Sequence, residues 1–127
     1  LERLHYLPFW TERRRSIALR YWDEIINTNL TLLEKPSHPS NHVHHLFIIR
    51  TSDRQRLQDH LLKQGINALI HYPIPCHRQP AIQASLSSIP SLPNTTIFAD
   101  TCLSLPIHPY LTDREVSQVI SACNSFV

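Results

Sequence analysis

HHLFIIR (residues 44–50) begins the stretch of sequence that decides the predicted fold. It is followed directly by TSDRQRLQDHLLKQG (residues 51–65) and INALIHYP (residues 66–73). The apolar run from Leu46 to Ile49 is unbroken, which is typical of a strand covered on both faces. We therefore expect a buried strand over His44–Arg50, followed by a helix and a return to the same sheet.

The second of these segments carries the start and stop signals of a helix. Ser52, with Gln55 three residues later, predicts a capping box at its beginning. Gly65 marks its end, where a left-handed residue is favoured. The residues Ala68–Tyr72 then predict a second strand, which Pro73 stops. The buried face of this helix is expected to consist of Leu57, Leu61 and Leu62.

A long amphipathic helix is predicted before the strand. It should run from about Thr11 to Thr28, with Thr11 as its cap, inside a first helical segment of about residues 9–29. Its apolar face has helical spacing. The residues of that face are Ile17, Ala18, Tyr21, Trp22, Ile25 and Ile26.

The C-terminal part repeats the alternation of helix and strand after a Pro-rich loop over residues 73–93. A short helix over Asn94–Cys102 and a strand over Leu103–Leu105 are expected. Thr112 with Glu115 predicts a capping box for the last helix. The buried face of that helix should be Val116, Val119, Ile120 and Cys123.

This element order predicts an α/β (α+β) fold: a two-layer sandwich in which helices pack on a small three-stranded sheet. The sandwich should occupy residues 43–127 of one domain that covers residues 1–127. A chain of 127 residues with 42% apolar and 17% charged residues fits one globular domain with a modest core.

Composition excludes several classes of function. A net charge of +2 is too small to indicate nucleic-acid binding, and a single glycine excludes a Gly-rich phosphate loop. There is no apolar run of about 18 residues, so no membrane span is expected. Three cysteines without CxxC spacing favour a reducing, cytoplasmic setting. The absence of Met predicts that residue 1 is not a translation start and that the chain is a piece of a longer protein.

The densest polar signal is HYPIPCHRQ, residues 71–79, which leaves the end of a predicted strand. Ligands often bind at such ends in α/β proteins. The imidazole of His71 and the phenol of Tyr72 both donate and accept hydrogen bonds, which suits a hydroxyl-rich ligand. A rigid surface loop without a ligand is the alternative interpretation.

Three further clusters have simpler explanations. Cys76 and His77 are neighbours in an extended segment and should point apart, so a Cys–His nucleophile is not favoured. A zinc site on the histidines of residues 38–45 lacks further ligands nearby. The basic run over residues 13–15 is typical of a solvated helix face or the rim of an interface. Lys35 and Lys63 are expected to be exposed, unlike a cofactor-binding lysine.

Several stretches together resemble one family, the DegT/StrS-type sugar aminotransferases. Residues 14–21 are similar to its R-x-x-I-A-x-x-Y helix and residues 45–50 to its strand Y-H-L-F-V-I-R. Gly65-Ile66 followed by residues 71–79 resembles its G-I and H-Y-P-x-P-L-H-x-Q loop. Residues 103–112 resemble its L-S-L-P-x-H-P-x-L-T segment. The resemblance covers nearly the whole chain and is limited to the C-terminal region of the family.

The resemblance implies the C-terminal small domain of a fold-type I pyridoxal phosphate enzyme, with the cofactor on a larger N-terminal domain absent from this chain. The parent enzyme would be a homodimer that aminates keto-sugar nucleotides in cell-surface polysaccharide or deoxyamino-sugar biosynthesis. Candidate substrate contacts are His71, Tyr72 and, more weakly, His77. No catalytic, cofactor-binding or metal-binding residue and no nucleic-acid or membrane partner is implied for this chain, which alone should be inactive.

Two other classes of function remain open at this point. A stand-alone small-ligand-binding or regulatory α/β module would use the same H-Y-P loop. A His-based metal protein is the third interpretation and depends on the histidines of residues 38–45.

Overall fold

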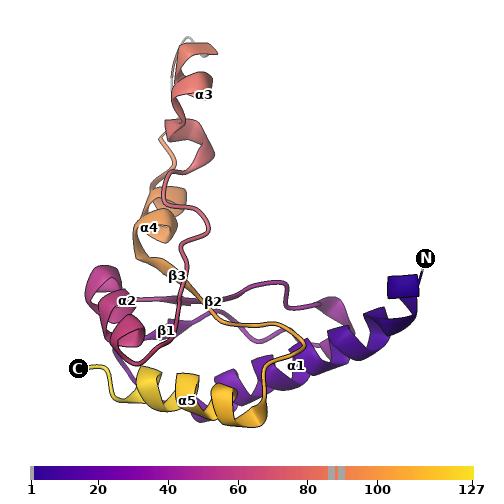
Figure 1. The fold of residues 1–127 in the computed structure, drawn as a ribbon. Coiled ribbons are helices and arrows are strands. Elements are labelled where there is room, and N and C mark those ends of the chain that lie inside the picture. Colours follow the sequence, from indigo (N-terminus) through magenta and orange to yellow (C-terminus); the bar gives the residue numbers. More distant parts are fainter. Residues whose placement is uncertain (1, 86–87, 89–90) are drawn as a thin grey trace.

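The computed structural model describes residues 2–85, 88 and 91–127. A small sheet lies over two helices, and a narrow arm rises from the other side (Figure 1). The elements in chain order are η1 (Glu2–Tyr6), α1 (Leu7–Glu24), β1 (Thr31–Leu32), η2 (Pro39–Asn41), β2 (Phe47–Arg50), α2 (Arg54–Lys63), η3 (Cys76–Arg78), α3 (Pro80–Ser85), α4 (Pro93–Thr101), β3 (Cys102–Leu105) and α5 (Asp113–Asn124).

The sheet has three antiparallel strands in the order β1-β2-β3. Phe47 pairs with Leu105 and Arg50 with Cys102 along β2 and β3, and Leu32 of β1 pairs with Ile49. All four residues of β3 are buried. The predicted α/β class with a three-stranded sheet and packed helices is thus confirmed.

The third strand of this sheet is not the one that the sequence predicts. Ala68–Tyr72 does not form a strand; only Leu69 pairs, through an isolated bridge to Ser104. Continuing this antiparallel register would place Asn67 opposite Pro106, which has no N–H and whose carbonyl accepts the Tyr21 hydroxyl at 2.7 Å. The ladder therefore cannot extend in that direction. The edge position next to β2 is taken by Thr31–Leu32.

The first helix begins and ends earlier than predicted. Helix α1 spans Leu7–Glu24 and has a proline in its first turn, where the fixed φ of proline suits the helix. Thr11 therefore lies inside the helix and does not cap it. At the other end, Ile26 N–H donates to the Asn124 side chain at 2.9 Å. This tertiary hydrogen bond replaces the helical one that the predicted extension to Thr28 requires.

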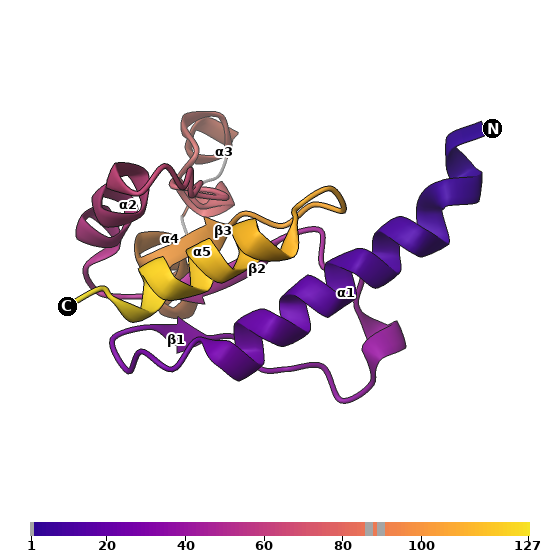
Figure 2. The ribbon, with the colours of Figure 1, turned by 60° about the horizontal axis from the view of Figure 1, so that its bottom comes forward.

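Helices α1 and α5 lie side by side below the sheet, with α2 at the end where the chain's C-terminus lies (Figures 1 and 2). The face predicted for α5 is confirmed, because all four of its residues are buried. In α1, Ile17, Ala18 and Tyr21 are buried, but Ile26, which is predicted for the same face, lies beyond the end of the helix and is 78% exposed. In α2, Leu57 and Leu61 are buried and Leu62 is exposed.

The two predicted capping boxes have different outcomes. Thr112 and Glu115 form theirs, with side chain and backbone bonded in both directions. Ser52 forms none: α2 begins at Arg54, and Thr51 Oγ1 accepts the N–H of Asp53 at 3.3 Å. Gly65 has φ +76°, as the predicted helix end requires.

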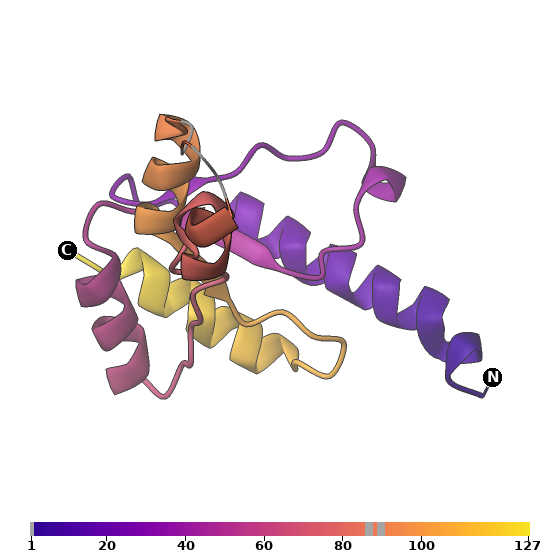
Figure 3. The ribbon, with the colours of Figure 1, turned by 90° about the horizontal axis from the view of Figure 1, so that it is seen from above.

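The Pro-rich segment contains helices where a loop is predicted. After the Leu69 bridge the chain rises through η3 and α3, and α4 brings it back to β3, so that the arm stands in front of the sheet in Figure 3. Helix α4 (Pro93–Thr101) agrees with the predicted Asn94–Cys102 helix to within one residue at each end. Residues 86–87 and 89–90 lie outside the described residues.

Candidate functional site

The H-Y-P loop starts at the Leu69 bridge, so the position of His71 depends on β3. Leu69 exchanges two backbone hydrogen bonds with Ser104, of 3.1 and 2.7 Å. Two residues later, Nδ1 of the half-buried His71 lies 3.0 Å from Ser104 Oγ. The His71–Tyr72 peptide is cis. The Tyr72 ring lies edge-on to the imidazole, with centroids 5.6 Å apart, and is 74% exposed.

A hollow of about 160 Å³ opens beside His71. Imidazoles, an amide and a hydroxyl line it together with apolar side chains, so it offers several hydrogen-bonding groups. It is bounded by His45, Leu46, Asn67, Leu69, His71, Ser104, Leu105, Pro106 and Ile107. Of the residues here, sequence reasoning identified His71 but missed Ser104, Asn67 and His45 as its neighbours.

His77 does not join this hollow. It lies in η3 and lines a separate space of about 410 Å³ with Arg78 and Thr96. Its side chain is buried, and its Nδ1 has no hydrogen-bond partner among the described residues. The structure therefore groups His71 with Tyr72 and places the third candidate contact in a different cavity.

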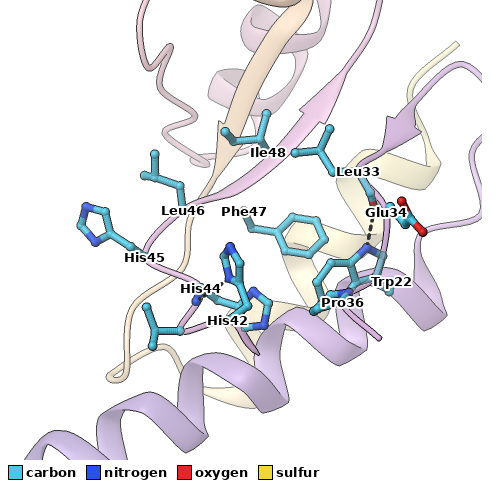
Figure 4. A pocket seen from close by; sticks show the side chains of 11 residues that line it. Trp22, Leu33, Glu34, Pro36, His42, His44, His45, Leu46, Phe47 and Ile48 are labelled. Carbon is cyan, nitrogen blue, oxygen red and sulfur yellow. Dashed lines mark hydrogen bonds between the residues drawn. The ribbon is translucent and has the colours of Figure 1, made fainter. Parts of the chain in front are cut away.

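A hollow of about 430 Å³ lies between the end of α1 and the start of β2 (Figure 4). Trp22 and Phe47 form much of its apolar wall, with ring centroids 5.0 Å apart. Trp22 Nε1 donates to the carbonyl of Leu33 at 2.9 Å, which fixes the indole. The rings of His42 and His44 lie tilted against one another beside this wall, with centroids 4.3 Å apart. From the sequence, these histidines are weighed as metal ligands, but solvated or capping side chains are the favoured interpretation.

The histidines of residues 38–45 have structural contacts. His38 Nδ1 accepts the Ser40 N–H, and His42 Nδ1 accepts the His44 N–H at 2.9 Å. Within the described residues, no group of three or more His, Cys, Asp or Glu side chains could hold a metal ion.

His44 should make stability depend on pH. Its imidazole is buried, and desolvation, with the charges of His42 and Arg15, lowers its pKa from 6.5 to about 4. The unfolded chain thus binds a proton at a higher pH than the folded one. The contribution of His44 to the free energy of unfolding is therefore fully present above pH 6.5. It decreases by on the order of 2 kcal/mol as the pH falls from 6.5 toward 4.

Urea unfolding at a series of pH values measures this effect. His44→Asn, which tolerates the φ of +50° at this position, should flatten the pH dependence between 6.5 and 4. His5→Asn, a change at an exposed residue of η1, is the control. An unchanged pH dependence in His44→Asn would contradict the assignment.

The three arginines of the basic run on α1 make intramolecular ion pairs and hydrogen bonds. Arg13 pairs with Asp113 at 2.9 Å, and Arg15 lies 3.5 Å from Glu12. Arg14 Nη1 donates to the carbonyls of His44 (3.3 Å), His45 (3.4 Å) and Ile107 (2.8 Å). These guanidinium groups are engaged in internal contacts, unlike the solvated face that the sequence predicts.

Cys76 and His77 offer no nucleophile–base pair: the Cys76 thiol is exposed, and His77 Nδ1 is unpaired within the described residues. The other two cysteines, Cys102 and Cys123, are buried and free. Burial raises the pKa of Cys123 to about 12, so this thiol is inert at neutral pH.

The fold of this chain is also found in solved structures of aminotransferases. A crystal structure of Streptomyces venezuelae DesV with a ketimine intermediate is similar, with TM-score 0.86 and 37% identity over 96% of this chain and 33% of that one. NtdA from Bacillus subtilis with bound cofactor PMP has TM-score 0.84 and 27% identity, over 96% of this chain and 29% of that one. The fold is therefore that of a part of the pyridoxal phosphate-dependent aminotransferases.

The sequence comparison names the family within this class. The dTDP-3-amino-3,4,6-trideoxy-alpha-D-glucose transaminase of Streptomyces venezuelae is 37% identical over 120 residues, which are 94% of this chain and 32% of that protein. The family model matches residues 1–124, and the chain belongs to the DegT/DnrJ/EryC1/StrS aminotransferase family. The chain spans about a third of the length of the relatives it matches.

No helix among the described residues combines the length and the apolar character that crossing a membrane requires.

Proposed function

We propose that this chain is the C-terminal small domain of a pyridoxal phosphate-dependent aminotransferase that acts on keto-sugar nucleotides, in deoxyamino-sugar or cell-surface polysaccharide biosynthesis. The observation that carries the proposal is agreement in both sequence and fold with sugar aminotransferases over nearly the whole chain. The relatives' additional length leaves room for a cofactor domain outside the residues 1–127.

The residues of this chain do not fit a pyridoxal phosphate site. A Schiff-base lysine has to be desolvated and close to the aldehyde. Lys35 is exposed and pairs with Asp23 at 3.1 Å, and Lys63 lies exposed in the last turn of α2. The cofactor, which supplies the electron sink of transamination, is therefore assigned to the N-terminal domain of the parent enzyme.

The contribution of this chain is to bind and orient the substrate. His71 and Tyr72 present an imidazole and a phenol at one edge of the sheet, and both groups can hydrogen-bond sugar hydroxyls. His77 is the third proposed contact. Because it lines a different cavity, it would touch a different part of the substrate from the other two.

Several partners follow from the same proposal: the large N-terminal domain, a second copy of the parent enzyme in a homodimer, and the nucleotide sugar. The N-terminal end of the chain offers apolar surface for the large domain or the second copy. Leu4, Tyr6, Leu7 and Phe9 are between 52% and 66% exposed there. Three unpaired thiols fit a cytoplasmic location.

The isolated chain should form no specific adduct with pyridoxal phosphate. Titration with the cofactor, reduction with borohydride and peptide mapping should give only weak, distributed labelling of exposed amines. Lys35→Arg and Lys63→Arg are matched variants, and each should remove only the weak label at its own position. One stoichiometric adduct on either lysine, abolished by its Arg variant, would instead support a stand-alone protein with its own chemistry.

A further inference from the structure

Ser104 is a buried polar residue in the middle of β3, the strand on which all four residues are buried. Its own backbone is fully paired, because its N–H and its carbonyl both bond to Leu69. The hydroxyl therefore needs a partner outside the backbone ladder, since a buried polar group without one destabilises the fold. That partner is Nδ1 of His71, at 3.0 Å.

The direction of this hydrogen bond follows from counting protons. A neutral imidazole has one N–H and one acceptor nitrogen. If Nδ1 carried the proton, the Ser104 hydroxyl would accept it, and its own proton would have no acceptor among the described residues. If the hydroxyl donates to Nδ1, every buried group of the pair is satisfied. The second arrangement leaves the proton of His71 on Nε2.

We propose that Ser104 is a positioning residue that fixes His71 as the Nε2–H tautomer and holds the imidazole against the hollow beside it. Nε2 has no hydrogen-bond partner among the described residues, so its N–H is free for a ligand. The ligand group that His71 recognises is then an acceptor oxygen, such as a carbonyl or a hydroxyl accepting through a lone pair. The identity of that ligand as a sugar rests on the proposed function, but the tautomer does not.

The register of the Leu69 bridge supports this assignment. Because Leu69 and Ser104 exchange both backbone hydrogen bonds, they are directly opposite one another, and His71 lies two residues further along. Both His71 and Ser104 line the same hollow of about 160 Å³. In this register, the Ser104 hydroxyl lies within hydrogen-bonding distance of the His71 imidazole, the first in the H-Y-P loop.

The test is ¹⁵N NMR of the histidine side chains of the 127-residue chain at a pH where His71 is neutral. In the wild-type chain, His71 Nδ1 should resonate as an unprotonated nitrogen and Nε2 as a protonated one. Ser104→Ala should shift both resonances toward the averaged values of a tautomer mixture. Ser104→Thr, which keeps the hydroxyl, should restore the wild-type pattern.

Ser16→Ala is the matched control, because its hydroxyl bonds to the carbonyl of Arg13 and not to an imidazole. It should leave the His71 resonances unchanged. A wild-type spectrum with the proton on Nδ1, or identical His71 spectra in the wild type and in a folded Ser104→Ala, would overturn the inference. Circular dichroism establishes whether each variant is folded. If Ser104→Ala does not fold, the NMR spectrum of the wild-type chain still decides which His71 nitrogen carries the proton.

A second experiment tests the proposed substrate contact of His71 separately from the role of Ser104. UDP-glucose, a readily obtained sugar nucleotide, is titrated into the wild-type chain while the His71 Nε2–H resonance is followed. A saturable shift supports contact with the sugar nucleotide. No shift, with the Nε2–H tautomer intact, would remove the proposed substrate contact and leave the role of Ser104 standing.

Discussion

Tyr21→Ala is expected to lower the free energy of unfolding by about 3–5 kcal/mol, the range for removing a large aromatic side chain from a core. Tyr21 is fully buried on α1 and packs edge-on against Phe47 of β2, with ring centroids 5.0 Å apart. Its hydroxyl donates to the carbonyl of Pro106 at 2.7 Å, just beyond β3. One side chain thus joins the helix to β2 and to the segment that follows β3, and its loss leaves a cavity between the layers.

Urea unfolding followed by far-UV circular dichroism at pH 7.5 measures this loss. Tyr21→Phe keeps the ring and removes only the hydroxyl, so it should cost about 1–2 kcal/mol, with the Pro106 carbonyl left unsatisfied. Leu19→Ala on the outer side of the same helix is the control, because Leu19 is 40% exposed. Equal losses in Tyr21→Ala and Leu19→Ala would contradict the burial described here.

Arg14→Met is expected to be the second most destabilising of these changes, at about 2–3 kcal/mol. The guanidinium joins α1 to carbonyls at one end of the sheet, where the start of β2 pairs with the end of β3: those of His44 and His45 before β2 and of Ile107 after β3. Methionine keeps most of the apolar stem, so the loss isolates the hydrogen bonds of a charged donor.

The matched control for that change is Arg15→Met, one residue further along. Arg15 donates to a single carbonyl, that of His42, and its pair with Glu12 is exposed. We expect a loss below about 1 kcal/mol. Thermal unfolding of the two variants side by side gives the comparison, and a larger loss for Arg15→Met would show that the Arg14 contacts contribute little.

Both changes fall in the segment that resembles the R-x-x-I-A-x-x-Y helix. Arg14, Ile17, Ala18 and Tyr21 all face the sheet or its ends, and the last three are fully buried. In this chain the motif therefore stabilises the packing of α1 on the sheet. The groups proposed to face a ligand come from elsewhere, namely from the H-Y-P loop and the strand beside it.

Much of the fold could be predicted because its signals are local. The alternation of helix and strand, the Thr112–Glu115 capping box and the Gly65 helix end depend on residues close in sequence. The candidate site was predictable only in part. His71 and Tyr72 were identified from their position in the loop, while Ser104 gave no signal in an otherwise apolar strand until the bridge to Leu69 placed it beside His71.

The sequence by itself determined the class of fold, the buried face of α5, most of the buried face of α1 and the family resemblance, because helical periodicity and capping are properties of neighbouring residues. Only the tertiary structure decided which segment completes the sheet, where α1 ends and which cavity each histidine lines. Those outcomes depend on hydrogen bonds between distant residues, such as Tyr21 to Pro106, Asn124 to Ile26 and Ser104 to His71. A backbone group that such a contact satisfies is no longer available to the helix or strand that local pattern predicts.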